Sequence, residues 1–350
     1  MRIAQVAPLI ESVPPRFYGG TERVVSYLTE ELVKQGHDVT LFASGDSRTN
    51  AKLEAITHEA LRLKKDQTDP LAHHIIMLNR INKLTHKFDV IHFHIDMLHF
   101  AQHQYMMTPS VTTMHGRLDL PHLPAVFNEF RDVPIISISN SQRAPLPNAN
   151  WQATVYNGVP IENYAYVQNP GNYLAFVGRI SPEKGIERAI QIAMHVGMKL
   201  YIAAKVDKVD EDYYQNRIKP QLNHPLIEYI GEVNEQEKNT FLGGAYATLF
   251  PIDWPEPFGL VMIESLACGT PVVAYNCGSV SEVMLNGETG FIVNSLDEAI
   301  DAVERIDTIS RRCCRYVFEK RFSASQMAIN YLKVYQSMVD DNEYQKPIAV

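Results

Sequence analysis

Residues 3–43 read IAQVAPLIESVPPRFYGGTERVVSYLTEELVKQGHDVTLFA, and this stretch decides the fold. Ile3–Ala7 has the length of a strand, and a loop rich in proline and glycine follows it. We expect Thr21 to cap a helix whose apolar residues recur at helical spacing, and Gly36 to end it. Val39–Ala43 then resembles the next strand. This β-α-β order predicts a parallel sheet with a right-handed crossover.

The same alternation of short apolar segments with helical segments continues along the chain. A segment rich in proline and asparagine, 145–160, separates two series of such units and is typical of a domain junction. We therefore predict an α/β fold with two tandem Rossmann-like, doubly wound domains facing across a cleft, because ligands bind outside the carboxyl ends of parallel strands. Further strands are expected at 90–93, 110–114, 134–138, 173–177, 200–203, 227–230 and 247–250, and helices at 183–196, 212–222, 235–242, from 260 and at 323–338.

Composition and charge exclude several classes of protein. The chain has 350 residues, of which 45% are apolar and 21% charged, values that exclude a disordered or fibrous protein. Its net charge is -8, and this whole excess lies in residues 151–350, which carry 17 basic and 25 acidic side chains. A broad nucleic-acid surface usually needs a basic domain, so we expect no nucleic-acid partner.

The sequence also carries signals about location. The four cysteines have neither a disulfide-framework spacing nor a CxxC pair, which fits a reducing compartment. The first residues contain no apolar core of a signal peptide, and no stretch of about 20 apolar residues could span a membrane. We expect a cytoplasmic protein.

The stretch EPFGLVMIE at 256–264 has two glutamates separated by seven residues. Its proline and glycine should keep Glu256 in a loop, and a helix beginning at Leu260 would present its first amides to an anion. Glu264, about one turn inside that helix, could accept hydrogen bonds from vicinal hydroxyls. A capping carboxylate followed by a solvated glutamate explains the spacing equally simply, so both interpretations stay open.

A second stretch, GRISPEKG at 178–185, follows a predicted strand. It places Arg179 and Lys184 on a strand-to-helix turn, where a diphosphate would be held. The glycines allow the backbone to approach a ligand, as does the pair Gly19–Gly20 in the first loop. Alternatively, both cations lie at the surface and pair with Glu183 or Glu187.

Taken together, these motifs resemble the bacterial retaining glycosyltransferases of family 4, which have the GT-B fold. The resemblance runs nearly from end to end, and the order and spacing of the motifs make it specific. The motifs are GGTE (19–22), TMHG (113–116), SISNS (137–141), NGV (157–159), GR with KG (178–185), GEV (231–233), the glutamate pair (256–264) and GSVSEV (278–283).

This resemblance implies that the second domain binds a nucleoside diphosphate sugar. Arg179 and Lys184 would contact the diphosphate, Glu264 the ribose hydroxyls, and Glu256 the donor sugar. From the first domain, Gly20 would approach the diphosphate and His115 would lie beside the reacting face of the sugar. The remaining implied positions are Gly231, Glu232 and Val233 near the base, and the backbone of Phe258, Gly259 and Leu260 at the sugar.

The implied reaction is retaining transfer of a hexosyl group to a sugar, lipid-linked or small-molecule hydroxyl, without a metal or other cofactor. UDP is favoured as the nucleotide, and GDP is the second choice. His115, Glu256, Arg179 and Lys184 would form the catalytic set, with a β-phosphate oxygen taking the proton of the acceptor. The alternatives are another GT-B enzyme, such as a nucleotide-sugar epimerase or a glycan phosphorylase, and a binding module without catalysis.

Family members end in a helix that returns to the first domain. The resemblance therefore implies an acceptor-side domain formed by residues 1–155 plus 323–350, and a donor-binding domain formed by residues 156–322. The base, the donor sugar, the acceptor, the linkage and the oligomeric state leave no trace that we can interpret.

Histidines are concentrated in the first domain, where 11 of the 13 occur before residue 123. His92 and His94 share one face of a strand, and His99 and His103 have i, i+4 spacing, so a zinc site has to be considered. No cysteine or HExxH context accompanies them. We therefore favour structural histidines or a polar wall on the acceptor side.

Three further features have plain interpretations. Residues 52–65, from Lys52 to Lys65, form an amphipathic pattern that we interpret as a surface helix, although such a helix also suits weak association with an anionic membrane. We expect Trp254 to be a packing residue rather than a platform for a sugar. Cys268 is expected to be buried and inert.

Overall fold

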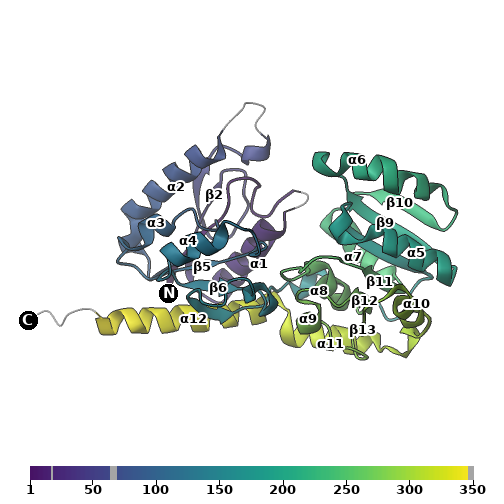
Figure 1. The fold of residues 1–350 in the computed structure, drawn as a ribbon. Helices are drawn as coiled ribbons and strands as arrows, with labels where there is room; N and C mark the ends of the chain where they lie inside the picture. Colours follow the sequence, from purple (N-terminus) through teal and green to yellow (C-terminus); the bar gives the residue numbers. More distant parts are fainter. Residues whose placement is uncertain (17–18, 64–68, 346–350) are drawn as a thin grey trace, which may run out of the picture. The chain divides into compact units, whose positions relative to one another are not determined.

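The computed structural model describes residues 1–16, 19–63 and 69–345 and divides into two compact units (Figure 1). Unit 1 contains Met1–Gly158 together with the chain from Ala324 onward, and unit 2 contains Val159–Ser323. Each unit is built on one parallel sheet with helices packed on it. The predicted α/β fold with two doubly wound, Rossmann-like sheets is therefore confirmed.

The sheet of unit 1 has seven strands in the order β3-β2-β1-β4-β5-β6-β7. Its chain order reverses between β1 and β4, and that reversal is where doubly wound sheets bind ligands. The strands are β1 (Arg2–Val6), β2 (Asp38–Ser44), β3 (Lys52–Thr57), β4 (Val90–Phe93), β5 (Ser110–Thr113), β6 (Ile135–Ser137) and β7 (Trp151–Thr154).

Helices cover both faces of this sheet. Alternate residues of β1 point to opposite sides and so contact different helices. Ala4 and Val6 pack with apolar residues of α2 in one core cluster. Gln5 lies on the other face, where its side chain reaches the last helix, α12. The helices of unit 1 are α1 (Gly20–Lys34), α2 (Pro70–Leu84), α3 (Phe100–His103), α4 (Leu123–Glu129) and α12 (Ala324–Gln345).

The sheet of unit 2 has six strands in the order β10-β9-β8-β11-β12-β13. Its order reverses between β8 and β11, so the turn after β8 stands at the corresponding ligand position. The strands are β8 (Tyr173–Arg179), β9 (Lys199–Lys205), β10 (Ile227–Gly231), β11 (Ala247–Phe250), β12 (Val272–Tyr275) and β13 (Gly290–Val293). The helices are α5 (Ile186–Val196), α6 (Glu211–Tyr213), α7 (Glu235–Gly244), α8 (Leu260–Ala267), α9 (Val280–Val283), α10 (Leu296–Glu304) and α11 (Arg311–Arg321).

The final helix, α12, belongs to unit 1 and contacts α1 and β4 (Figure 1). Its apolar stripe includes Met327, Tyr331 and Tyr335, whose side chains are almost fully buried. The chain therefore enters unit 2 after Gly158 and comes back to unit 1 at Ala324. Within residues 1–16, 19–63 and 69–345, no helix has the length and apolar character needed to cross a membrane.

The predicted helix over 52–65 is wrong. Residues 52–57 form the edge strand β3, which pairs in parallel with β2, and a short 3-10 turn at Leu61–Leu63 follows. Leu53 and Ile56 pack against the two core clusters of the sheet, and this packing overrides the helical pattern. Lys64 and Lys65 lie outside the described residues. The argument for a membrane-binding helix loses its basis, and membrane association itself stays a prediction.

Two helix boundaries and one whole helix also differ from the prediction. Gly19, rather than Thr21, occupies the N-cap position of α1, and its carbonyl accepts from the amide of Arg23. α5 begins at Ile186 rather than at 183, because Gly185 adopts a left-handed conformation with φ 68°. The helix predicted at 212–222 is split into one α-turn, a π-turn and a 3-10 turn.

Candidate functional site

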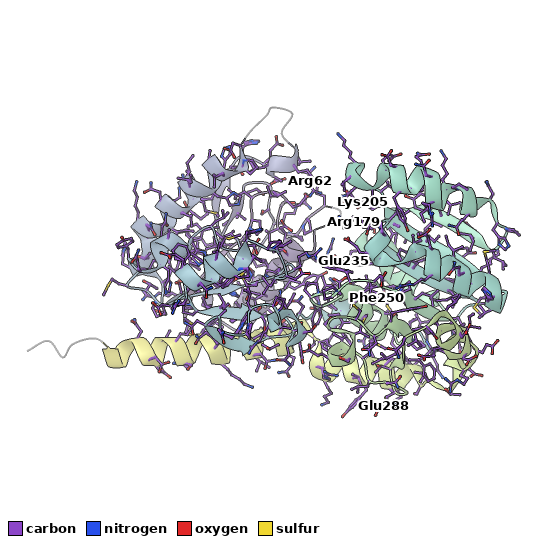
Figure 2. All side chains as sticks on the ribbon, viewed as in Figure 1. Arg62, Arg179, Lys205, Glu235, Phe250 and Glu288 are labelled. Atoms are coloured by element: carbon purple, nitrogen blue, oxygen red, sulfur yellow. The ribbon has the colours of Figure 1, made fainter. Side chains whose placement is uncertain are left out.

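Arg179 ends β8 and lies beside Lys205 of β9 (Figure 2). Three carboxylates of unit 2 surround its guanidinium. Its guanidinium forms an ion pair with Glu183, and its nitrogens lie 3.7 Å from the carboxylates of Asp207 and Asp210. Lys205 is the register partner of Arg179 on β9 and forms an ion pair with Asp207 at 2.8 Å. Burial raises the pKa of Asp210. Two cations and three carboxylates thus meet at the carboxyl ends of two neighbouring strands.

Lys184 follows on the same turn and contacts Glu256, which lies 72 residues later. The indole nitrogen of Trp254 donates to Glu256 Oε2 at 3.1 Å, and Lys184 Nζ stands 5.1 Å from the centre of the indole ring. The lysine and glutamate side chains are only 17% and 12% exposed, so little water screens their pairing. The two sequence motifs meet in this cluster, where Trp254 contacts both Lys184 and Glu256. Its interpretation as a packing residue rather than a platform for a sugar stays a prediction.

Two glycines allow the loops of this cluster to approach each other. A Cβ on Gly185 would lie 1.9 Å from the carbonyl oxygen of Pro251. A Cβ on Gly278 would lie 2.4 Å from the backbone nitrogen of Glu256, and Ser279 donates its amide to the carbonyl of Glu256. These contacts hold Pro251 against the β8–α5 turn and the backbone of Glu256 against the loop after β12.

Glu264 lies on the second turn of α8 and is only 1% exposed. Its Oε1 accepts from the hydroxyl of Tyr164 at 3.1 Å and from Lys238 Nζ at 2.5 Å. The interpretation of Glu264 as a solvated helix glutamate is therefore wrong, and so is that of Glu256 as a capping carboxylate. A buried carboxylate at the start of a helix, paired with one lysine, is instead suited to holding hydroxyl groups.

The other residues predicted for the donor side lie on several elements, all of them in unit 2 except Gly20. Gly231 ends β10 with φ 80°, and Glu232 and Val233 follow it. The side chain of Phe258 is 2% exposed and packs against Phe322, and its carbonyl accepts from the hydroxyl of Ser279 at 2.8 Å, which leaves its amide for any ligand contact. Gly259 is the N-cap of α8 in a left-handed conformation, with φ 78°, and Leu260 begins the helix. Gly20 is the first residue of α1 in unit 1.

His115 follows β5 in unit 1 and belongs to a chain of buried polar side chains. Its Nε2 lies 2.8 Å from Nδ1 of His94, whose Nε2 lies 2.8 Å from Oε1 of Gln5. The chain continues through Tyr335 to His92. Burial lowers the pKa of His115 to about 4 and the pKa values of His92 and His94 well below the usual value, so all three imidazoles are neutral near pH 7.

The four histidines considered for a zinc site have other protein partners. Both nitrogens of His92 and of His94 have protein partners, whereas His99 and His103 bond separately to Thr112 and Ser110. Across the described part of the chain, no group of three or more His, Cys, Asp or Glu side chains is arranged to hold a metal ion. The zinc alternative therefore finds no ligand set in these residues.

Because these histidines are buried, we expect the free energy of unfolding to depend on pH. Burial lowers the pKa of His99 to about 3, whereas the unfolded residue takes up a proton near pH 6.5. Acid therefore favours the unfolded state, and stability falls as the pH falls through about 6.5. The parent protein should lose free energy of unfolding between about pH 7 and pH 5.5. In His99→Gln this loss should be smaller by about 1 kcal/mol.

Urea denaturation at the two pH values measures this difference. The control is His58→Gln at an exposed position, which should leave the pH dependence as it is in the parent protein. An unaltered pH dependence in His99→Gln would contradict a neutral, buried His99.

The structure adds residues that the sequence motifs did not single out. Lys238 and Tyr164 are the partners of Glu264, and Asp207 and Asp210 flank Arg179. None of the four belongs to a recognised motif, and each lies far along the chain from its partner. Cys268 is buried as predicted, with its pKa raised to about 12 by burial, and all four cysteines are free thiols.

Comparison with known proteins places these features in context. Residues 18–162 match the family model described as "Glycosyltransferase Family 4", and residues 166–313 match the model "Glycosyl transferases group 1". The chain is 26% identical to a glycogen synthase of Mycobacterium tuberculosis over 79% of each chain. It is 24% identical to a phosphatidyl-myo-inositol mannosyltransferase of Mycobacterium leprae over 97% of each chain.

Solved structures show the same fold. The sucrose-phosphate synthase of Thermosynechococcus elongatus aligns with a TM-score of 0.78 at 16% identity, over 97% of this chain and 100% of that one. Anabaena HepE, in complex with UDP and glucose, aligns with a TM-score of 0.74 at 18% identity, over 96% of this chain and 100% of that one.

Proposed function

The chain is a glycosyltransferase of the family 4 type with the GT-B fold, and from this premise we propose that it transfers a hexosyl group from a nucleoside diphosphate sugar with retention of configuration. The observation that carries the proposal is the meeting of Lys184 and Glu256 beside Arg179 at the carboxyl end of β8. A diphosphate needs cations there, and a sugar needs a carboxylate next to them.

The donor would replace partners that the protein now supplies to itself. Arg179 exchanges Glu183 for a phosphate oxygen, and Lys184 exchanges Glu256 for another. Glu256 is then released to accept hydrogen bonds from hydroxyls of the donor sugar. The amides at Gly259 and Leu260 add the positive end of the α8 dipole, and Oε2 of Glu264 accepts from the ribose while Oε1 keeps Tyr164 and Lys238.

The chemical step depends on stabilising the departing diphosphate. As the glycosidic bond breaks, negative charge grows on the leaving phosphate, where Arg179, Lys184 and the start of α8 oppose it. We assign the proton of the acceptor hydroxyl to a β-phosphate oxygen, so no protein carboxylate has to act as a covalent nucleophile. His115 hydrogen-bonds the sugar and stabilises its developing charge. Because Arg179 and Lys184 supply the positive charge at the diphosphate, the reaction needs no divalent metal.

The nucleotide and acceptor are proposed by class. UDP is our first choice because HepE, which has the same fold, is described in complexes with UDP and UDP-glucose, and GDP is the second. The acceptor is a hydroxyl of a sugar, a lipid-linked sugar or a small molecule. We propose that unit 2 with α8 forms the donor side and that unit 1, with its histidines, forms the acceptor side.

A two-stage experiment tests this proposal. Thermal unfolding of the purified protein with UDP, GDP or ADP should show a higher midpoint for one nucleotide, because a ligand that binds the folded state stabilises it. The matching nucleotide sugars are then incubated with candidate acceptors, and release of nucleoside diphosphate is measured with and without a chelator. We expect release only with an acceptor, unchanged by the chelator, and a product with the anomeric configuration of the donor.

Other results would replace the proposal. Interconversion of a nucleotide sugar without any acceptor would indicate an epimerase, and release of a sugar phosphate from a glycan would indicate a phosphorylase. Nucleotide binding without turnover for any acceptor would indicate a binding module. Loss of activity in chelator would contradict the metal-independent mechanism.

A further inference from the structure

A continuous chain of hydrogen bonds joins His115 to the last helix of the protein. It runs from His115 through His94 and Gln5 to Tyr335 on α12, and then through His92 and Thr113 to Tyr331 on the same helix. The successive distances are 2.8, 2.8, 3.1, 2.6, 2.7 and 3.0 Å. Beyond His115, which is half-buried, every member is at least 98% buried, so water cannot replace its partners.

The direction of this chain follows from Gln5. Its amide nitrogen donates to the hydroxyl of Tyr335, so its amide oxygen accepts, and the group at that oxygen is Nε2 of His94. A neutral imidazole carries one proton, and because that proton is on Nε2, Nδ1 of His94 is an acceptor. Nε2 of His115 must then donate to it.

The other half of the chain has the same direction. Tyr335 accepts from Gln5 and can donate to Nδ1 of His92. Nε2 of His92 then donates to Thr113, whose hydroxyl donates to Tyr331. In this arrangement each intermediate group donates one bond and accepts one, and reversal of the Gln5 amide would reverse the bonds to His94 and His115. Burial keeps the three imidazoles neutral, as this count requires.

We propose that His94, Gln5 and Tyr335 are positioning residues that hold His115 as the Nε2–H tautomer, with an acceptor lone pair on Nδ1. The consequence for the reaction rests on the proposed function: His115 would accept a hydrogen bond from a hydroxyl of the donor sugar through Nδ1. The last helix, α12, packs on α1 and β4. Through the Tyr335 hydroxyl it would also help to fix the tautomer of His115.

The α12 helix offers a matched pair of variants. Tyr335→Phe removes the hydroxyl that links Gln5 to His92, and the Gln5 amide is then free to reverse. Tyr331→Phe removes a hydroxyl from an equally buried tyrosine one turn earlier, but only at the far end of the chain, beyond Thr113. A merely structural role for these tyrosines would make the two variants equivalent.

The measurement is the ¹⁵N spectrum of the full-length protein labelled at histidine, with the His115 signals assigned by their loss in His115→Gln. We expect the Nε2–H tautomer of His115 in the parent protein and in Tyr331→Phe, and a mixture of tautomers in Tyr335→Phe. In the transfer reaction, Tyr335→Phe should lower kcat about fivefold with little change in the KM for the donor, a moderate effect for an indirect partner of an imidazole.

Two results would overturn the proposal: a proton on Nδ1 of His115 in the parent protein, or an unchanged tautomer in Tyr335→Phe. If Tyr335→Phe does not fold, Gln5→Leu breaks the same link without changing α12 and is judged by the same criterion. The spectrum needs no substrate. An absence of glycosyl transfer would therefore reject the proposed function, while the tautomer result would still decide the role of the hydrogen-bond chain.

Discussion

Lys184→Ala is expected to lower kcat/KM for the nucleotide sugar about 100-fold, which corresponds to about 2.7 kcal/mol of transition-state stabilisation. The variant loses a charge-assisted hydrogen bond to the leaving diphosphate, worth about 1.5–3 kcal/mol. It also leaves Glu256, only 12% exposed, without its cation beside an incoming dianion. Most of the loss should appear in kcat, because the charge on the leaving group grows in the transition state.

The control for this prediction is another lysine of the same unit. Lys199 begins β9 and lies at the end of the sheet opposite to Lys205, so Lys199→Ala should keep kcat/KM within about twofold, as is usual for a change at an exposed position remote from a site. Lys184→Arg keeps the charge but not the compact ammonium, and we expect it to recover only part of the activity. A loss of less than about threefold in Lys184→Ala would reject its assignment to the diphosphate.

The sequence was sufficient for the fold because the alternation of strands and helices is repeated so often. The βαβ unit at 3–43, with its loop glycines and the stop at Gly36, is present almost as predicted. Prediction failed where tertiary contacts outweigh local pattern. Residues 52–57 have helical spacing but form an edge strand, since β2 offers them a ladder of hydrogen bonds and two core clusters accept Leu53 and Ile56.

Only part of the candidate site could be predicted, because the local sequence does not show which distant residues come into contact. Motif residues such as Arg179 and Glu264 were identified by their order along the chain, but their partners could not be. Lys238 reaches Glu264 from α7, and nothing local to either residue indicates that pairing. The histidines illustrate the same limit. The ring centres of His92, in β4, and His94, directly after it, do lie 3.9 Å apart, yet their partners include a tyrosine 243 residues later in the sequence.

The second large effect concerns the buried pair of Glu264 and Lys238. Glu264→Leu should lower the free energy of unfolding by about 3 kcal/mol, because it leaves the Lys238 ammonium without a partner in a largely buried position. The same variant should weaken nucleoside diphosphate binding about 50-fold, since the ribose loses its charged acceptor. Urea denaturation and titration calorimetry measure the two effects separately.

A second substitution separates fold from ligand. Lys238→Met alone also breaks the pair and should lose comparable stability, but it keeps Glu264 and should bind the nucleotide within about threefold of the parent protein. Glu264→Leu/Lys238→Met removes both charges and should regain most of the stability, because apolar side chains often replace a buried ion pair without loss. Nucleotide binding should remain weak in this double variant. If binding returned together with stability, Glu264 would be a structural residue and not the ribose ligand.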